Sequence, residues 1–229
     1  MLHLLNETSF RKDKIKRIRE DVIIIPRPKS METKELIREA AVEVISEVGF
    51  HNCNTDKIAE AAGVSVGTIY NYFRNKKDIL CYIFEVEHKN LKGFFDYLDQ
   101  KEIKTPEKIR LFLEKYFKRI REDWNLSKLL HDESNRPAQG LSREIMDYLI
   151  MIHGGLSKLL EEGIKEGSVY PDIDPLTTAA MIIGASGSVA LTALFQPDDL
   201  EEISLEAPDK IICFLVRGIF SVDYKAGSC

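Results

Sequence analysis

The chain has 229 residues, 44% of them apolar, and a formal net charge of −5. This length fits one large domain or two small ones, and the apolar content excludes a disordered chain. The 13 Gly and 8 Pro are too few for a turn-rich all-β protein, and the four scattered cysteines, without a CxxC pair, argue against a zinc module.

The charge is unevenly distributed along the chain. Residues 1–80 hold 14 Lys or Arg against 12 Asp or Glu, whereas residues 81–229 hold 18 against 25. A mildly basic N-terminal part on an acidic remainder suits a DNA-binding head on an acidic body, although many ordinary proteins are equally lopsided.

Residues 1–30 are interpreted as a basic N-terminal extension. The run RKDKIKRIR at 11–19 is followed by VIIIP and two prolines that break regular structure. Two readings stay open, a solvated extension and a basic arm that contacts DNA phosphates. The first residues do not resemble a signal peptide, because their apolar residues precede the basic ones.

From Ser30 onward, apolar residues recur three and four positions apart, which is typical of amphipathic helices. Gly49, Thr55, Asn75, Thr105-Pro106 and Asp174-Pro175 mark expected helix ends or starts. Apart from the ambiguous VIII, no strand alternation persists, and no repeat of fixed period occurs, so the predicted class is all-α. The expected helices cover residues 31–48, 55–62, 66–73, 75–97, 105–120, 124–135, 142–167, 175–195 and about 204–222.

Residues 176–195 carry no charge and are long enough to span a membrane. Thr, Ser and Gly interrupt the segment, and a buried helix of a soluble protein also looks apolar on most sides. With no second such segment and no basic flanks, we expect a buried helix and no membrane contact.

Residues 55–80 (TDKIAEAAGVSVGTIYNYFRNKKDIL) predict a helix-turn-helix, in which the second helix enters the DNA major groove. Gly63 permits the turn, and the small Ala59 lets the two helices cross closely. Ile69 and Phe73, four apart, share one face and anchor the second helix to the core. The positions left to contact DNA are Ser65, Val66, Thr68, Tyr70, Asn71 and Tyr72.

The stretch IREAAVEVISEVGFHNCNTDKIAEAAGVSVGTIYNYFRNKKDIL resembles the N-terminal domain of TetR-family regulators over about 50 residues without a gap. The shared pattern is a helix ending in Gly, then IA..AGVS.GT.Y.YF, then a Lys that opens the next helix. The resemblance implies a three-helix DNA-binding head at 31–78 and a helical body for ligand binding and dimerisation at 79–222.

The resemblance also implies roles for individual residues. Thr55, Tyr72 and Lys76 would bind phosphates. Thr68, Tyr70 and Asn71 would contact phosphates or base edges, and the Asn71 amide can pair with adenine. Val66 departs from the polar residues common at its position and offers only an apolar contact. The structural alternatives are a helix cap for Thr55, packing at the core edge for Tyr70 and Tyr72, and a solvated helix start for Lys76.

In this family the last two helices usually pair with those of a second copy. Here these helices are the expected ones at 175–195 and about 204–222. Small residues at 184–190 would allow close approach across a two-fold axis, and packing within one chain is the alternative. A two-fold dimer implies an inverted-repeat operator, from which a small effector would release a repressor.

A ligand pocket is expected among the middle helices. Arg136 would suit an anionic ligand, and a solvated helix end is the alternative. Large residues at helical spacing more often form core than a ligand wall. The stretches AAVEVISEVGFH, GTIYNYF and NKKDIL are similar to the TetR-type regulators of fatty-acid degradation, which implies an acyl-CoA effector. The candidate pocket residues are Phe112, Tyr116, Trp124, Arg136, Met146 and Met151.

An enzyme is not expected, because Walker A, GxSxG, HExxH and dinucleotide-binding glycine motifs are all missing. The five His show no ligand spacing, so no catalytic residue, metal site or cofactor is predicted. The expected location is the cytoplasm, on the nucleoid. Two alternatives stay open: a nucleoid-associated DNA-binding protein of the same fold that acts through a protein partner, and a membrane-anchored sensor.

Overall fold

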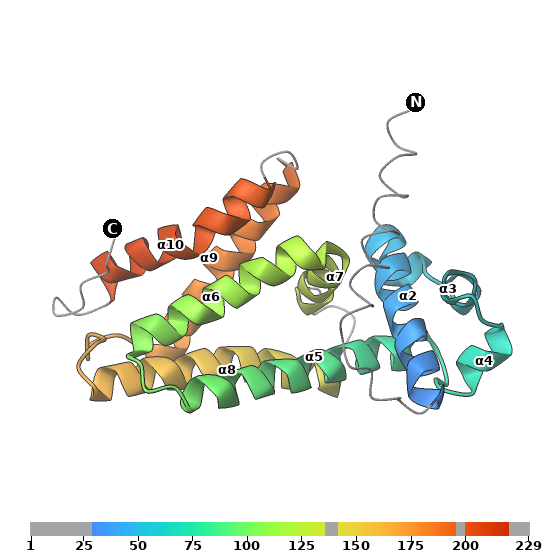
Figure 1. Ribbon diagram of the computed structural model, residues 1–229, viewed down its shortest axis with the longest axis horizontal. Helices are drawn as coiled ribbons and strands as arrows, with labels where there is room; N and C mark the ends of the chain where they lie inside the picture. The colour runs from blue at the N-terminus through green and yellow to red at the C-terminus, as the bar shows by residue number, and fades with distance from the viewer. Residues whose placement is uncertain (1–28, 136–141, 196–199, 220–229) are drawn as a thin grey trace, which may run out of the picture. The chain divides into compact units, whose positions relative to one another are not determined.

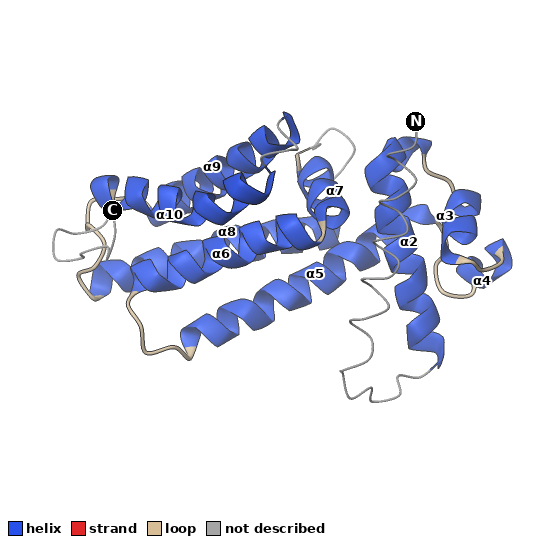
Figure 2. Cartoon of the chain, turned by 45° about the horizontal axis from the view of Figure 1, so that its top comes forward, coloured by secondary structure: helices blue, strands red, loops and turns tan. Residues whose placement is uncertain are grey.

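The computed structural model describes residues 29–135, 142–195 and 200–219, and within them all regular elements are helices (Figures 1 and 2). This confirms the predicted all-α class. The chain divides into two compact units, residues 1–35 and 36–229. Of the first unit only 29–35 are described, as the first turns of α2 (Lys29–Asn52). The basic run, the VIIIP segment and Arg136 lie outside the described residues.

The head of the second unit is built by the part of α2 from residue 36 onward, with α3 (Thr55–Ala62) and α4 (Val66–Tyr70). Ile37, Ala41 and Ile45, four apart along α2, are almost fully buried, as the apolar spacing predicts. At Gly49 the backbone leaves helical geometry, with φ 78° and ψ 154°, and the chain then turns into α3.

The long α5 (Lys76–Asp99) runs straight through the boundary expected between residues 78 and 79. It starts where predicted, because the side chain of Asn75 accepts a 3.0 Å hydrogen bond from the backbone N–H of Asp78. Since one continuous helix serves both regions, a division there remains a prediction about function.

The body consists of α5 with α6 (Thr105–Glu122), α7 (Trp124–Ser134) and α8 (Arg143–Lys165), followed by two C-terminal helices. Figures 1 and 2 show α8 lying along α5. Close packing explains Gly155, because a Cβ built there would lie 2.3 Å from Cε2 of Phe95.

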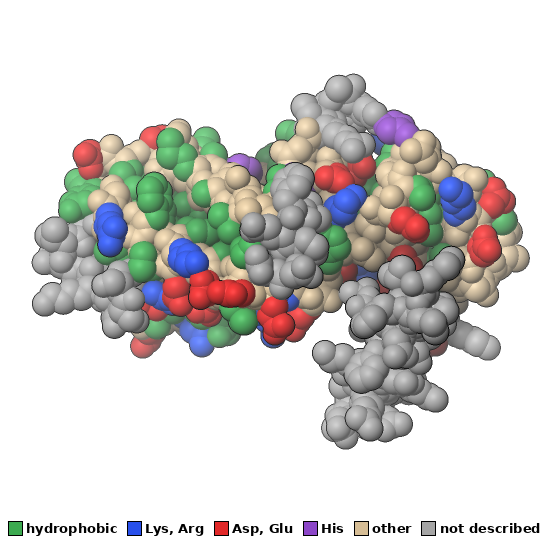
Figure 3. Space-filling model, turned by 90° about the horizontal axis from the view of Figure 1, so that it is seen from above, with side chains coloured by type: hydrophobic (Ala, Val, Ile, Leu, Met, Phe, Trp, Pro, Cys, Tyr) green, Lys and Arg blue, Asp and Glu red, His purple; other side chains and the backbone are tan. Residues whose placement is uncertain are grey.

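The two C-terminal helices are α9 (Pro175–Phe195) and α10 (Leu200–Gly218), and α10 packs on α6 and α9. By length and composition α9 is the one described helix that could cross a membrane, and only 28% of Pro175–Thr192 is buried. The expected burial therefore holds only for its inner side, where Ala179 and Ile182 are buried. Figure 3 shows hydrophobic side chains on the surface of this region.

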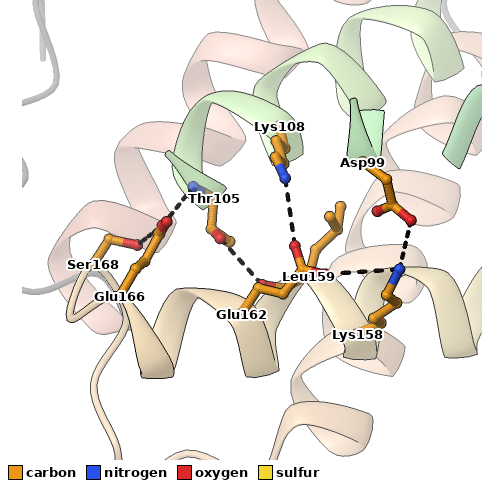
Figure 4. A network of polar contacts seen from close by, with 8 residues as sticks. All are labelled: Asp99, Thr105, Lys108, Lys158, Leu159, Glu162, Glu166 and Ser168. Carbon is orange, nitrogen blue, oxygen red and sulfur yellow. Dashed lines mark hydrogen bonds and ion pairs between the residues drawn. The ribbon is translucent and has the colours of Figure 1, made fainter. Parts of the chain in front are cut away.

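A polar network fixes the start of α6 against the end of α8 (Figure 4). Thr105 does not cap α6 as expected, because Lys104 occupies the N-cap and makes no side-chain cap bond. Glu166 replaces the missing cap and accepts hydrogen bonds from the Thr105 N–H at 2.7 Å and from the Ser168 hydroxyl at 2.5 Å. Thr105 Oγ1 in turn donates to the Leu159 carbonyl at 3.2 Å.

Candidate DNA-binding surface and ligand cavity

The turn between α3 and α4 has the geometry that the motif predicts. Gly63 adopts left-handed φ 66° and ψ 31°, and its N–H bonds to carbonyls of the last turn of α3. Ser65 is the N-cap of α4, and its Oγ accepts a 3.1 Å hydrogen bond from the N–H of Thr68. The same hydroxyl lies 2.9 Å from Thr68 Oγ1, so both side chains help to build the turn.

The anchoring of α4 is confirmed, because Ile69 is 0% and Phe73 4% exposed. The helix is shorter than predicted and ends at Tyr70, with the N–H of Asn71 closing the last turn. A five-residue helix places few side chains on its outer face.

Of the eight residues expected to contact DNA, Ser65, Tyr70 and Asn71 are exposed, and the other five are half-buried. Val66 and Tyr72 pack against the core. The hydroxyl of Tyr70 lies 3.4 Å from Oγ1 of Thr55, which links α4 to the start of α3. Thr55 is the first residue of α3, because Asn54 supplies the cap. Thr55 and Thr68 make up the rest of the half-buried set, together with Lys76.

Lys76 has a role that the sequence did not reveal. Its Nζ donates to the carbonyls of Phe50, His51 and Cys53 at 2.8, 3.0 and 2.8 Å. It also lies 4.7 Å from the centre of the Phe50 ring. An ammonium group has three N–H donors, so this geometry uses all of them within the head. No N–H donor of Lys76 is therefore left for the expected phosphate contact in this structure.

Three basic residues near the turn were not among the candidates. Lys57 on α3, Arg74 and Lys77 are all exposed. Arg74 pairs with Asp78 at 2.7 Å, in a salt bridge whose arginine side chain is 88% exposed. Exposed cations beside a helix-turn-helix suit sequence-independent phosphate contacts. The positive charge of these residues and their position in the motif could have identified them as candidates from the sequence.

A cavity of about 330 Å³ lies among α6, α7, α8 and α9. This volume is at the lower end of the roughly 300–1,000 Å³ usual for small-molecule pockets. Leu130, Ile152, Ile183 and Leu191 supply apolar wall from three helices. The arrangement can hold an apolar chain with a polar group at one side.

The polar side of the cavity is a row on α7, formed by Ser127, His131 and Ser134. These positions are four and three apart, so they share one helix face. Ser127 Oγ, His131 Nδ1 and Ser134 Oγ are buried and have no hydrogen-bond partner in the structure. Buried polar atoms are normally satisfied, so this row has capacity for a ligand or water.

Arg119 on α6 also lines the cavity, and its position is fixed from behind. Its Nη1 lies 3.2 Å from Oε2 of Glu87 on α5, and the Glu87 side chain is only 5% exposed. Asn90 donates to the other oxygen of Glu87 at 3.2 Å. Arg119 also hydrogen-bonds to Tyr148, whose pKa burial raises.

The candidate pocket residues are placed unevenly. Tyr116 lines the cavity, and burial raises its pKa to about 12. Trp124 lines a neighbouring cavity of about 20 Å³ that shares Tyr116. Phe112 is core instead, 4% exposed, because it stacks on Phe95 with ring centres 6.0 Å apart. Met146 is 39% exposed and Met151 packs against the core, so neither lines the cavity.

Sequence reasoning missed two parts of this site. Arg119 sits among other charged residues of α6 and looks like one more solvated side chain. The polar row on α7 did carry a signal, because Ser127, His131 and Ser134 follow helical spacing. The spacing alone does not say whether this row faces a cavity or solvent, so it is equally consistent with an exposed helix face.

Comparisons with known proteins agree with this geometry. The family profile described as "Bacterial regulatory proteins, tetR family" matches residues 37–83. The "Fatty acid metabolism regulator protein" of Bacillus subtilis (strain 168) is 33% identical over 197 residues, which is 84% of this chain and 96% of that protein. An uncharacterised HTH-type transcriptional regulator, YhgD, from the same strain is 25% identical over 67% of this chain and 80% of its own length.

Solved structures show the same relationship. The fatty acid degradation regulator FadR from Bacillus halodurans superposes with a TM-score of 0.70 at 26% identity, covering 82% of this chain and 96% of that one. The transcriptional regulator FadR from Bacillus subtilis, in complex with stearoyl-CoA, gives a TM-score of 0.65 at 29% identity, covering 78% and 97%.

Proposed function

We propose that this chain, which belongs to the TetR family of bacterial regulatory proteins, is a repressor. A long-chain acyl-CoA would release it from its operator. The chain is a transcriptional regulator and not an enzyme. Its proposed place is the cytoplasm, at the nucleoid. The comparisons do not support the alternative of a nucleoid-associated protein that acts through a protein partner.

The single observation that carries the effector proposal is the cavity with its unsatisfied polar row on α7. An acyl chain would lie against the apolar wall, and its carbonyl would meet the hydroxyls of Ser127 or Ser134. The B. subtilis regulator solved in complex with stearoyl-CoA supports this ligand class, because it shares the fold at 29% identity.

For DNA, we propose that Ser65, Tyr70 and Asn71 form the exposed contact set, with the Asn71 amide directed to a base edge. Thr55, Val66, Thr68 and Tyr72 would contribute through their accessible parts. Few side chains are then available to read bases, so part of the specificity would come from DNA shape.

The surface of α9 and α10 supports a proposed homodimer. Leu176 and Met181 on α9 are 58% and 67% exposed, and Phe214 on α10 is 74% exposed. Large apolar side chains gathered on neighbouring helices are typical of a subunit interface. Two heads on a two-fold body would then read an inverted repeat.

The dimer is tested with Phe214→Asp, which places a charge in the proposed interface. We expect the variant to elute as a monomer and to lose most of its operator affinity, since two half-sites are then bound independently. Ile150→Asp is the matched control, because Ile150 is a 62% exposed apolar residue on α8. A Phe214→Asp variant that remains a dimer would contradict the interface.

The DNA-binding surface is tested with the DNA upstream of the protein's own gene, at several salt concentrations. Tyr70→Ala and Asn71→Ala should each weaken binding, by about tenfold for a lost base contact. Tyr97→Ala is the control, since Tyr97 is exposed on α5 outside the head. Equal binding of wild type to this DNA and to random duplex would contradict a locally acting repressor.

A further inference from the structure

The fixed charges of the cavity wall cancel. Among the described residues that line the cavity, Arg119 is the one with a permanent charge, and Glu87 neutralises it from behind at 3.2 Å. Burial lowers the pKa of His153 and raises the pKa of Tyr116 to about 12, so neither adds charge near neutral pH. The other histidine of the wall, His131, has its Nδ1 3.6 Å from Oδ1 of Asp132, so a positive charge on its ring would be balanced by that carboxylate. A ligand group entering this part of the cavity meets an ion pair that is already complete.

A free carboxylate would bind poorly at this part of the cavity. An ionised carboxylate loses much hydration on burial and needs a cation of its own in return. Arg119 can provide one only by leaving Glu87, which strands a buried carboxylate, or by sharing its guanidinium between two like charges. The hydrogen bond from Asn90 to Glu87 opposes a retreat of that carboxylate.

An uncharged carbonyl has no such penalty. It requires only hydrogen-bond donors, and the hydroxyls of Ser127 and Ser134 are buried at the cavity without partners. Bonding these groups to the ligand also satisfies polar atoms that are otherwise unpaired. The wall is therefore complementary to an ester or thioester carbonyl.

We infer that the cavity selects an acyl chain in its uncharged ester or thioester form, and that Glu87 excludes the free carboxylate by holding Arg119. Glu87 acts through Arg119 and does not itself line the cavity, so it is a specificity-determining residue outside the contact set. The inference rests on the proposed function, because it names the chemical form of the acyl effector that the site accepts.

The test compares dodecanoate with its methyl ester, and with dodecanoyl-CoA, at about pH 8, where a carboxylic acid is fully ionised. The chain has a single tryptophan, Trp124, in the cavity adjoining the main one, so its fluorescence reports binding. Wild type should bind the ester at least about tenfold more tightly than the carboxylate. Glu87→Gln should strengthen carboxylate binding by about tenfold and leave ester binding nearly unchanged, because Arg119 is then uncompensated.

Glu85→Gln is the matched control, since Glu85 lies two positions earlier on α5, pairs with Lys89 and has a 49% exposed side chain. It should leave both affinities unchanged. If Glu87→Gln does not fold, Asn90→Ala, which removes the hydrogen bond to Glu87, should strengthen carboxylate binding in the same direction. Carboxylate affinity that stays unchanged in the folded variant overturns the role of Glu87. Equal wild-type binding of carboxylate and ester overturns the inference while the acyl effector stands. If stearoyl-CoA fails to bind as well as the three twelve-carbon probes, the proposed effector class falls and the inference with it.

Discussion

The ammonium group of Lys128 on α7 donates a 2.7 Å hydrogen bond to the backbone carbonyl of Ser46 on α2. Ser46 lies three residues before the helix break at Gly49, so its carbonyl belongs to the last turn of that helical segment, where carbonyls commonly lack an intrahelical donor. Lys128 also pairs with Asp132 at 3.1 Å. One helix thus lines the cavity with Ser127 and His131 and caps the head with Lys128.

This relationship predicts that Lys128 couples the cavity to the head. Lys128→Met keeps the aliphatic stem but removes the bond to Ser46. Binding of stearoyl-CoA to the variant should persist, while the effector-induced loss of operator affinity should shrink by about fivefold, roughly 1 kcal/mol of coupling. Operator titrations with and without stearoyl-CoA measure this. Lys118→Met is the control, because Lys118 is 63% exposed on α6. Unchanged coupling in Lys128→Met would show that α7 does not transmit the signal through this bond.

Lys76 gives a second prediction, because its capping role and a phosphate role differ in their signatures. Lys76→Met should destabilise the protein by about 2 kcal/mol, since three carbonyls lose a charged donor. Chemical denaturation measures that loss. Lys77→Met, at an exposed neighbouring position, should be nearly neutral. If Lys76→Met instead keeps full stability and flattens the salt dependence of DNA binding by about one unit per head, its ammonium contacts phosphate.

Alanine substitutions at the two adjacent glycines of α8 should change the stability of the protein in opposite directions. Gly155→Ala forces a methyl against the Phe95 ring and should cost about 1–3 kcal/mol of stability. Gly154 is exposed with nothing within 4 Å of a built Cβ, so Gly154→Ala should stabilise by up to about 1 kcal/mol through helix propensity. Thermal and urea unfolding of the two variants check this. Equal effects of the two changes would contradict the packing of α8 on α5.

The Glu166 cap predicts a pH-dependent stability. Burial raises its pKa, but hydrogen bonds from Ser168 and Thr105 outweigh burial and leave the pKa lowered. Because the pKa is lower in the folded state, ionised Glu166 stabilises the fold at pH values above the unfolded pKa of about 4.3. This contribution to stability is lost as the pH falls through the folded-state pKa. Glu166 is exposed, so solvent screens its charge, and Glu166→Gln should cost no more than about 0.5–1 kcal/mol near pH 7. Its difference from wild type should disappear on acidification. Glu161→Gln, exposed on α8, is the control. A difference that persists in acid would mean that the carboxylate charge is not what caps α6.

The fold was largely predictable because its signals are local. Apolar spacing gave the helices, and Gly63 with Ser65 gave the turn, since each feature acts within a few residues. The caps by Lys76, Lys128 and Glu166 were not predictable, because each joins residues more than twenty positions apart or follows from helix packing. Distance along the chain hides such partners.

The cavity was harder to predict than the head for the same reason. Phe112 and Tyr116, four apart on α6, look alike in sequence, yet packing buries one in the core and turns the other to the cavity. Arg119 gains its meaning only from Glu87 on another helix. α9 looked like a buried helix, but its outer side is exposed in the single chain.

The most direct test of the central claim is the release of operator DNA by an acyl-CoA. Fluorescence anisotropy of labelled upstream DNA bound to the protein would be followed during titration with stearoyl-CoA, and with CoA as the control. The account predicts that micromolar stearoyl-CoA frees the DNA while CoA leaves it bound, because only the former places an acyl chain in the cavity. Operator affinity that stays unchanged at saturating stearoyl-CoA would contradict it.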